Sequence, residues 1–379
     1  MNQDIPTTPL KKNLASPEIL KLQETLGRGK SVIGIEIGFT SVNVAQRAIY
    51  QGKPTIIKVA VEKIIVTNED QRESATVEAL KKVLARFNTK NAEIICIVAN
   101  PKTVIDHIAM PLMPVTELPD AVKLEVSSSQ LFAIENPIID FQLMGRIIDK
   151  GVDKNNVRVV ATPKSSVDSL LAKFKPQQSD PLEGLKKLFG VGESTGINIV
   201  RIIPLSIAIE NIIKKCKFKE QEIIATIEIG SMASELNVYR ASQLEFSRKI
   251  NVTGLDFTKS LTSSLFTDMG KIELTMEEAE EVKKEHGIPF PEEDFLVRAK
   301  ITANQALSLL RPKLEQLARE INRSFDYYQD KRHAGKIDKL IMFGGGALLR
   351  RLPELLNVEL GVPVQLGNPL QDVDMFSDT

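Results

Sequence analysis

A four-residue run, Ile-Glu-Ile-Gly, occurs twice in this chain, at residues 35–38 and again at residues 227–230. In both places an apolar run precedes it, and small polar residues and then an alternating strand that contains Asn-Val follow it. One copy alone would mean nothing, but two copies with matched surroundings predict two related halves of one molecule. The strand and helix patterns around the first copy predict a mixed sheet covered by helices.

Each copy carries a carboxylate, Glu36 or Glu228, inside an otherwise apolar strand just before the glycine. A carboxylate without a partner is very costly in such a buried position, so some partner is required. Mg²⁺ binds oxygen ligands and usually keeps several of its waters. We therefore expect Glu36 and Glu228 to hold Mg²⁺ through water, beside a bound phosphate chain.

The turns that follow the two carboxylates suit the phosphate chain itself. Glycine lets backbone N–H groups come close to phosphate oxygens, and Ser and Thr add hydroxyl donors. Two such turns, one from each half, are expected to face each other and pinch a polyphosphate. The predicted phosphate-binding residues are Gly38, Phe39, Thr40, Ser41, Gly230, Ser231 and Met232.

Two further glycine-rich segments need separate interpretation. The triplet at 344–346 follows an apolar strand, lets the backbone press against a flat group, and precedes a helix whose N-terminal N–H groups would point to the same space. By itself the triplet is equally well explained as a tight strand-to-helix turn. The run from Gly190 to Gly196 lacks the Lys-Ser/Thr ending of a nucleotide-binding P-loop, which favours a mobile connector.

The composition bounds the remaining possibilities. The 379 residues suffice for several domains, and 49 basic residues balance 49 acidic ones, so no basic field indicates nucleic acid as a partner. No apolar run approaches the ~20 residues that span a bilayer. The two cysteines and three histidines show neither disulfide nor zinc-ligand spacing. These observations predict a cytoplasmic protein that reaches a membrane only through partners.

Taken together, the glycine-bearing segments resemble the motifs of the actin-like ATPase superfamily of actin, the Hsp70 chaperones and sugar kinases. IEIGFTS is similar to the first phosphate motif, IEIGSMAS to the second, and LIMFGGGALL to the adenosine motif. Three other segments resemble the PilM family of type IV pilus assembly proteins: MPLMPVTELPDAVKLEV, LRPKLEQLAREINRSFDYYQ and GGGALLRRLPELLNVELGVPVQLGNPLQDV. The resemblance covers roughly residues 31–374.

The resemblance implies an α/β, actin-like (ribonuclease H-like) duplicated fold, with two lobes around a nucleotide cleft and an inserted subdomain of the FtsA and PilM type. It implies ATP or ADP with Mg²⁺ in the cleft. The implied base and ribose contacts are Gly254, Glu280, Lys283, Gly344, Gly345 and Gly346. The predicted divisions are a tail (1–30), the first half in two parts (31–102 and 201–222), the inserted subdomain (103–200), the second half (223–338, with a small helical subdomain at about 270–325) and the adenosine-motif segment with the C-terminal return (339–379).

The resemblance also implies partners. In that family the first half and the inserted subdomain form a groove that binds the cytoplasmic N-terminal peptide of PilN, an inner-membrane protein. A PilN-like partner would therefore recruit this chain to the inner membrane, and the nucleotide state would modulate that binding. Other pilus platform proteins and motor ATPases are further candidate partners.

Departures from the family pattern bear on catalysis. Family phosphate motifs often carry Asp where Glu36 and Glu228 stand, and actin-type first motifs often carry Lys near the position of Asn43. No residue that would orient the attacking water is identified, so the catalytic residues are unassigned and at most a slow ATPase is expected. Three alternatives stay open. They are an FtsA-like filament-forming protein, a small-molecule phosphotransferase on the same fold, and a degenerate actin-like fold that binds no nucleotide.

Overall fold

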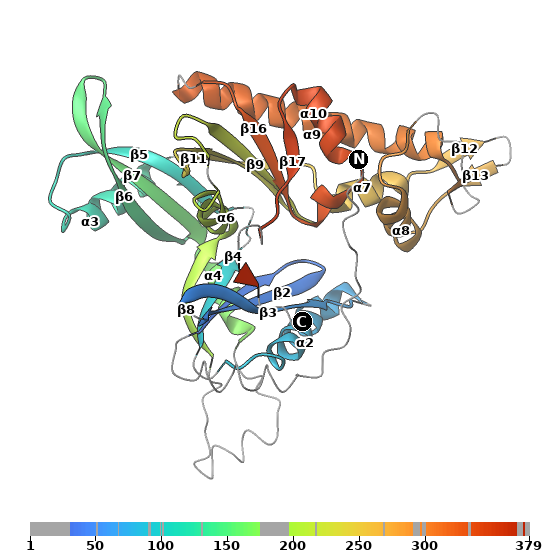
Figure 1. Ribbon diagram of the computed structural model, residues 1–379, viewed down its shortest axis with the longest axis horizontal. Coiled ribbons are helices and arrows are strands. Elements are labelled where there is room, and N and C mark those ends of the chain that lie inside the picture. Colours follow the sequence, from blue (N-terminus) through green and yellow to red (C-terminus); the bar gives the residue numbers. More distant parts are fainter. Residues whose placement is uncertain are drawn as a thin grey trace, which may run out of the picture.

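The computed structural model describes residues 31–50, 52–66, 68–89, 92–98, 100, 102–129, 132–174, 197–216, 218–267, 270–290, 296–297, 301–332, 335–369 and 374–375. The tail expected at 1–30 and the connector expected at 190–196 lie outside the described residues. Three larger sheets organise the described chain (Figure 1). In that view one large sheet lies above the other, and the third sheet lies to one side.

The first large sheet has six strands in the order β18-β3-β2-β1-β4-β8. Its central strand β1 pairs antiparallel with β2 and parallel with β4. Helix α2 covers one face, and alternate side chains of the strands, such as Ile33, Ile35 and Val44, are buried there. The elements are β1 (Ser31–Ile37), β2 (Ser41–Tyr50), β3 (Lys53–Lys63), η2 (Glu69–Gln71), α2 (Arg72–Leu84), β4 (Ala92–Val98), β8 (Asn198–Pro204) and β18 (Asp374–Met375).

The second large sheet has five strands in the order β11-β10-β9-β16-β17. Helices α7, α9 and α10 contribute to the largest apolar core, which contains Ile227, Phe257 and Leu317. Its elements are β9 (Ile223–Ile229), β10 (Ser234–Arg240), β11 (Gln243–Ile250), α7 (Gly254–Leu261), β16 (Lys339–Phe343), η4 (Gly345–Leu348), α10 (Leu352–Leu360) and β17 (Val364–Leu366). Between α7 and β16 come β12 (Leu265–Thr267), β13 (Gly270–Ile272), α8 (Met276–His286), β14 (Leu296–Val297), β15 (Ile301–Thr302) and α9 (Ala303–Arg332).

Helix α9 runs without interruption through Pro312. The position of this proline predicts a kinked or split helix, because proline removes one backbone donor and its ring clashes with the preceding turn. The helix is not split, since the apolar face of α9 is buried along its length, from Ala306 and Leu310 to Phe325 and Tyr328. No helix in the described residues contains a stretch long and apolar enough to cross a membrane.

The third sheet, in the order β5-β7-β6, lies between β4 and β8 in the sequence. Helix α3 covers one of its faces around Leu118, Val122 and Val159. After β7, helix α4 returns to the six-stranded sheet, where its Leu170 is buried in the same apolar core as Ile33 and Ile35. The elements are β5 (Val104–Pro111), α3 (Leu118–Ser128), β6 (Pro137–Asp149), β7 (Val152–Pro163) and α4 (Lys164–Ala172). Hereafter the first lobe is the six-stranded sheet with α2 and α4, the second lobe is the five-stranded sheet with its helices, and the inserted subdomain is β5–β7 with α3.

Helix α6 (Leu205–Ile213) lies where these three units meet (Figure 1). Its Ile209 and Ile213 share an apolar cluster with Ile105 of the inserted subdomain and with Tyr239 of the second lobe. Glu210 of α6 forms a buried ion pair with Arg158 of β7, at 2.5 Å. The inserted subdomain is therefore packed against α6 and the second lobe.

The two large sheets begin in the same way, as the repeated run predicts. The Gly38 N–H donates to the Ser41 carbonyl at 2.9 Å, and the Gly230 N–H donates to the Ala233 carbonyl at 2.9 Å. In the paired strands Glu36 lies opposite Asn43, and Glu228 lies opposite Glu235. Two hairpins with the same turn therefore start the two lobes.

Candidate functional site

The first glycine turn presents a hydrogen-bonded row of polar side chains at the end of β1. The Asn43 amide donates to the Glu36 carboxylate at 3.1 Å, and the Ser41 hydroxyl donates to the Asn43 oxygen at 3.3 Å. A Cβ on Gly38 would lie 3.1 Å from the Ser41 carbonyl, so the turn favours glycine there. Asn43, which stands where related first motifs often carry a lysine, thus supports Glu36.

The second glycine turn is more tightly enclosed. A Cβ on Gly230 would lie 2.7 Å from the Ala233 carbonyl oxygen and 3.1 Å from the Glu228 carboxylate. Helix α7 begins against this turn, because the Gly254 N–H donates to the Gly230 carbonyl at 2.8 Å and the Leu255 N–H donates to the Ser231 carbonyl at 3.1 Å. Gly230 and Ser231, two of the predicted phosphate residues, are therefore in direct contact with the start of α7.

The glycine triplet packs against the same turn. Gly344 has a φ of +86°, and a Cβ there would lie 2.5 Å from the Ile229 carbonyl oxygen and 2.6 Å from a Glu228 oxygen. A Cβ on Gly346 would meet the Ile229 side chain at 2.4 Å, whereas one on Gly345 would meet nothing within 4 Å. Gly344 and Gly346 are thus required by close approach to β9, and Gly345 alone is open.

Glu280 and Lys283 of α8 lie at the start of α7. The Lys283 ammonium donates to the Gly254 carbonyl at 3.0 Å and pairs with Glu280 at 2.6 Å. Thr258 also donates to Glu280, at 2.6 Å. Burial tends to raise the pKa of Glu280, but the bonds from Lys283 and Thr258 outweigh it and lower the pKa. The carboxylate is therefore charged and held at the edge of the glycine cluster.

The carboxylates of the two lobes act on each other. Burial is the largest of three causes that together raise the pKa of Glu228 from 4.5 to about 8, and the charges of Glu36 and Glu235 are the other two. Since Glu36 is in the first lobe and Glu228 in the second, the ends of β1 and β9 lie close enough for their charges to interact. A cation placed there would relieve this repulsion.

A pH experiment tests this electrostatic arrangement. Because the folded-state pKa of Glu228 lies above its usual value, the folded chain holds that proton more tightly than the unfolded chain does, and the free energy of unfolding should fall as pH rises from 4.5 to about 8. Glu228→Gln has no charge to bury. It should be more stable than the original chain near the upper limit by about 2–4 kcal/mol and equal to it near the lower one. Urea unfolding without metal or nucleotide measures this, and parallel pH profiles of the two chains would contradict it.

The sequence does not point to Arg72, which the structure places on the first turn. Its guanidinium lies 3.6 Å from the centre of the Phe39 ring, donates to the Phe39 carbonyl at 3.0 Å and pairs with Glu69 at 2.7 Å. The Arg72 guanidinium therefore makes a cation–π contact with the Phe39 ring. Arg72 begins a helix far along the sequence, so no local pattern connects it to the turn. Thr40 and Met232, by contrast, are exposed at the turns.

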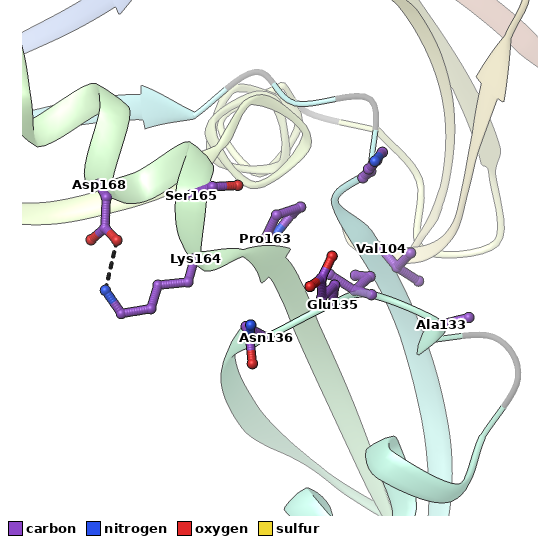
Figure 2. A pocket seen from close by; sticks show the side chains of 10 residues that line it. Val104, Ala133, Glu135, Asn136, Pro163, Lys164, Ser165 and Asp168 are labelled. Carbon is purple, nitrogen blue, oxygen red and sulfur yellow. Dashed lines mark hydrogen bonds and ion pairs between the residues drawn. The ribbon is translucent and has the colours of Figure 1, made fainter.

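A hollow lies between the inserted subdomain and α4, as Figure 2 shows. It has a volume of about 820 Å³. Lys164 and Asp168 of α4 form an ion pair at 2.6 Å at one side of the hollow, and Val104, Ala133 and Pro163 line it from the inserted subdomain. Its lining, called the groove below, consists of Lys102, Val104, Ala133, Ile134, Glu135, Asn136, Pro163, Lys164, Ser165 and Asp168.

Comparison with known proteins places this architecture. The solved structure of a PilM–PilN type IV pilus biogenesis complex matches with a TM-score of 0.66 and 20% identity, over 91% of this chain and 90% of that chain. MreB5 of Spiroplasma citri bound to AMPPNP matches at a TM-score of 0.47 and 13% identity, over 89% and 91%. The cell shape-determining protein MreB of Pasteurella multocida (strain Pm70) is 24% identical over 159 residues. That alignment covers 38% of this chain and 45% of MreB, so it spans less than half of the relative.

The match to the PilM–PilN structure confirms the predicted actin-like α/β fold. The family model for the type IV pilus assembly protein PilM matches residues 34–379. The matched region contains both Ile-Glu-Ile-Gly turns, the inserted subdomain and the glycine triplet. The chain therefore belongs to the PilM family of type IV pilus assembly proteins.

Proposed function

We propose that this chain is an ATP-binding scaffold of the type IV pilus assembly platform that holds the cytoplasmic N-terminal peptide of a PilN-like membrane protein in its groove. The observation that supports the nucleotide half of the proposal is the matched pair of glycine turns, each with a carboxylate on the strand before it, one in each lobe. In this proposal the PilN-like partner recruits the chain to the membrane.

The cleft residues fit Mg²⁺ and a phosphate chain. Two facing carboxylates offer a divalent cation the oxygen ligands it prefers, and phosphate oxygens and water complete its shell. Bound Mg²⁺ would supply charge neutralisation. The glycine N–H groups of the two turns are bonded within the turns, so the residues that follow Gly38 and Gly230 would offer backbone N–H groups to the phosphates. Gly344–Gly346 would offer a flat backbone surface to the base.

The groove fits an extended peptide. Its volume of about 820 Å³ exceeds the needs of one side chain, and its walls combine apolar residues with charges of both signs. Lys102 and Lys164 offer cations, and Glu135 and Asp168 offer carboxylates. A membrane protein's cytoplasmic segment could enter while its anchor stays in the bilayer.

Isothermal titration calorimetry with Mg-ATP tests the cleft. Glu36→Gln should weaken Mg-ATP binding at least tenfold, because one of two metal-facing charges is lost, and a tenfold change equals about 1.4 kcal/mol. Glu117→Gln is the matched control, since Glu117 is exposed on the inserted subdomain and should bind as the original chain does. If Glu36→Gln and the original chain bound Mg-ATP with equal affinity, the proposed role of Glu36 in holding Mg²⁺ would be wrong.

The groove is tested by filling it. Ala133 is exposed on its wall, so Ala133→Trp adds a large ring to the hollow without disturbing a buried core. Binding of a synthetic N-terminal PilN peptide, followed by fluorescence anisotropy, should weaken more than tenfold while Mg-ATP affinity stays the same. Undiminished peptide binding would move the docking site elsewhere.

A further inference from the structure

The two walls of the groove are anchored in different apolar cores. Helix α4, which carries Lys164 and Asp168, is fixed to the first lobe, because its Leu170 is buried in that lobe's core. The opposite wall belongs to the inserted subdomain, whose Ile105 is buried in the cluster shared with the second lobe. A swing of one lobe against the other must therefore change the shape of the groove.

A ladder of facing side chains leads from the nucleotide cleft towards that groove. Glu235 lies opposite Glu228 in the β9–β10 pair and opposite Lys249 in the β10–β11 pair. Side chains directly opposite each other in antiparallel strands stand on the same face and interact. The opposite charges of Glu235 and Lys249 attract each other. Glu235 thus lies between Lys249 and Glu228 on the same face of the sheet.

Lys249 then crosses to the first lobe. Its ammonium donates to the Asn100 carbonyl at 3.3 Å, and Asn100 follows β4. The Asn100 side chain in turn ties together both sides of the groove's inner end. Its amide donates to the Ser166 hydroxyl of α4 at 2.6 Å, and its oxygen accepts the Lys102 N–H at 2.6 Å. Lys102 and Ser165, the neighbour of Ser166, line the groove.

We propose that the Lys249–Asn100 link is the element that couples nucleotide binding in the cleft to peptide binding in the groove. This inference rests on the proposed function, because it needs both ligands. A ligand that changes the angle between the lobes changes the distance that Lys249 must span. Asn100 is bonded to both Ser166 and Lys102, so a displacement of Asn100 displaces both sides of the groove. The free energy of binding one ligand therefore depends on whether the other is bound.

The test is a thermodynamic cycle on the full chain with two probes, Mg-ATP and a synthetic N-terminal PilN peptide. In the original chain, saturating Mg-ATP should change the peptide Kd by at least about fivefold. In Lys249→Met, each ligand alone should bind within about threefold of the original, but the change caused by Mg-ATP should shrink to within about twofold. Lys271→Met, on an exposed lysine of the same lobe, should retain the full change.

Asn100→Ala provides the second variant. It keeps the backbone carbonyl that accepts Lys249 but removes the bonds to Ser166 and Lys102. Because the two contacts act in series, Asn100→Ala should lower the coupling as Lys249→Met does, and the double variant should lower it no further.

The outcomes separate the two proposals. If the original chain binds neither Mg-ATP nor the peptide, the proposed function falls and this inference falls with it. If both ligands bind and Lys249→Met keeps the original coupling, or if the original chain shows no coupling, the proposed function stands and only the link is overturned. Loss of coupling in the Met and Ala variants, with intact single-ligand affinities for Lys249→Met, supports the link.

Discussion

Gly344→Ala should destabilise the chain by roughly 3 kcal/mol or more and abolish measurable Mg-ATP binding. The backbone at Gly344 has φ +86° and ψ 164°, a region that is essentially reserved for glycine. The added methyl would also lie 2.5 Å from the Ile229 carbonyl oxygen and 2.6 Å from the Glu228 carboxylate. Either β16 or the second turn must move, and both belong to the cleft. Urea unfolding and calorimetry measure the two effects.

The neighbouring glycine is the matched control. A Cβ on Gly345 meets nothing within 4 Å, and its φ is not in the left-handed range. Gly345→Ala should therefore change the unfolding free energy by less than about 0.5 kcal/mol. If both alanine variants were equally stable, the close approach of the triplet to β9 would be wrong.

Glu210→Ala should cost about 3–5 kcal/mol, because it strands a buried guanidinium. The side chains of Arg158 and Glu210 are 6% and 1% exposed, and their charged atoms are 2.5 Å apart. Arg158 keeps one other bond, from its guanidinium to the Gln142 oxygen at 2.7 Å, which does not neutralise it. Since this pair joins the inserted subdomain to α6, limited proteolysis should also cut that subdomain faster. Urea unfolding measures the loss.

Two comparisons isolate the cause. Glu78→Ala removes an exposed pair with Lys82 on α2 and should cost only about 0–1 kcal/mol. Arg158→Met combined with Glu210→Leu removes both charges and should recover most of the lost stability, since an apolar replacement of both partners is often neutral. A double variant as unstable as Glu210→Ala would show that packing, and not an uncompensated charge, sets the effect.

The parts of the site that follow from sequence are the local ones. The strand, carboxylate and glycine of each Ile-Glu-Ile-Gly run are adjacent residues, so one short pattern predicts the whole hairpin, and the repeat predicts the second from the first. The glycine triplet is equally local, and its close approach to β9 explains why two of its three glycines are required. The assignment of these residues to phosphate, base and metal stays a prediction.

The remaining features depend on residues that only the folded chain brings together. Arg72 reaches Phe39, and Arg158 reaches Glu210, across long stretches of sequence that carry no matching pattern. The groove is defined by the packing of the inserted subdomain against α4. Pro312 shows the opposite failure, in which a strong local rule for splitting a helix is overcome by the buried apolar face of α9.

The path of the chain between its two large sheets limits how the molecule can move. The backbone leaves the six-stranded sheet after β8 to begin the five-stranded one, and it comes back after β17 to add β18 beside β3. The polypeptide backbone therefore joins the two lobes at two places. We expect rotation of the two lobes about the line between these two connections to be easier than sliding of one lobe past the other. If the lobes move mainly by this one rotation, a ligand that changes the angle between them at one site must also change the geometry at the other sites between the lobes.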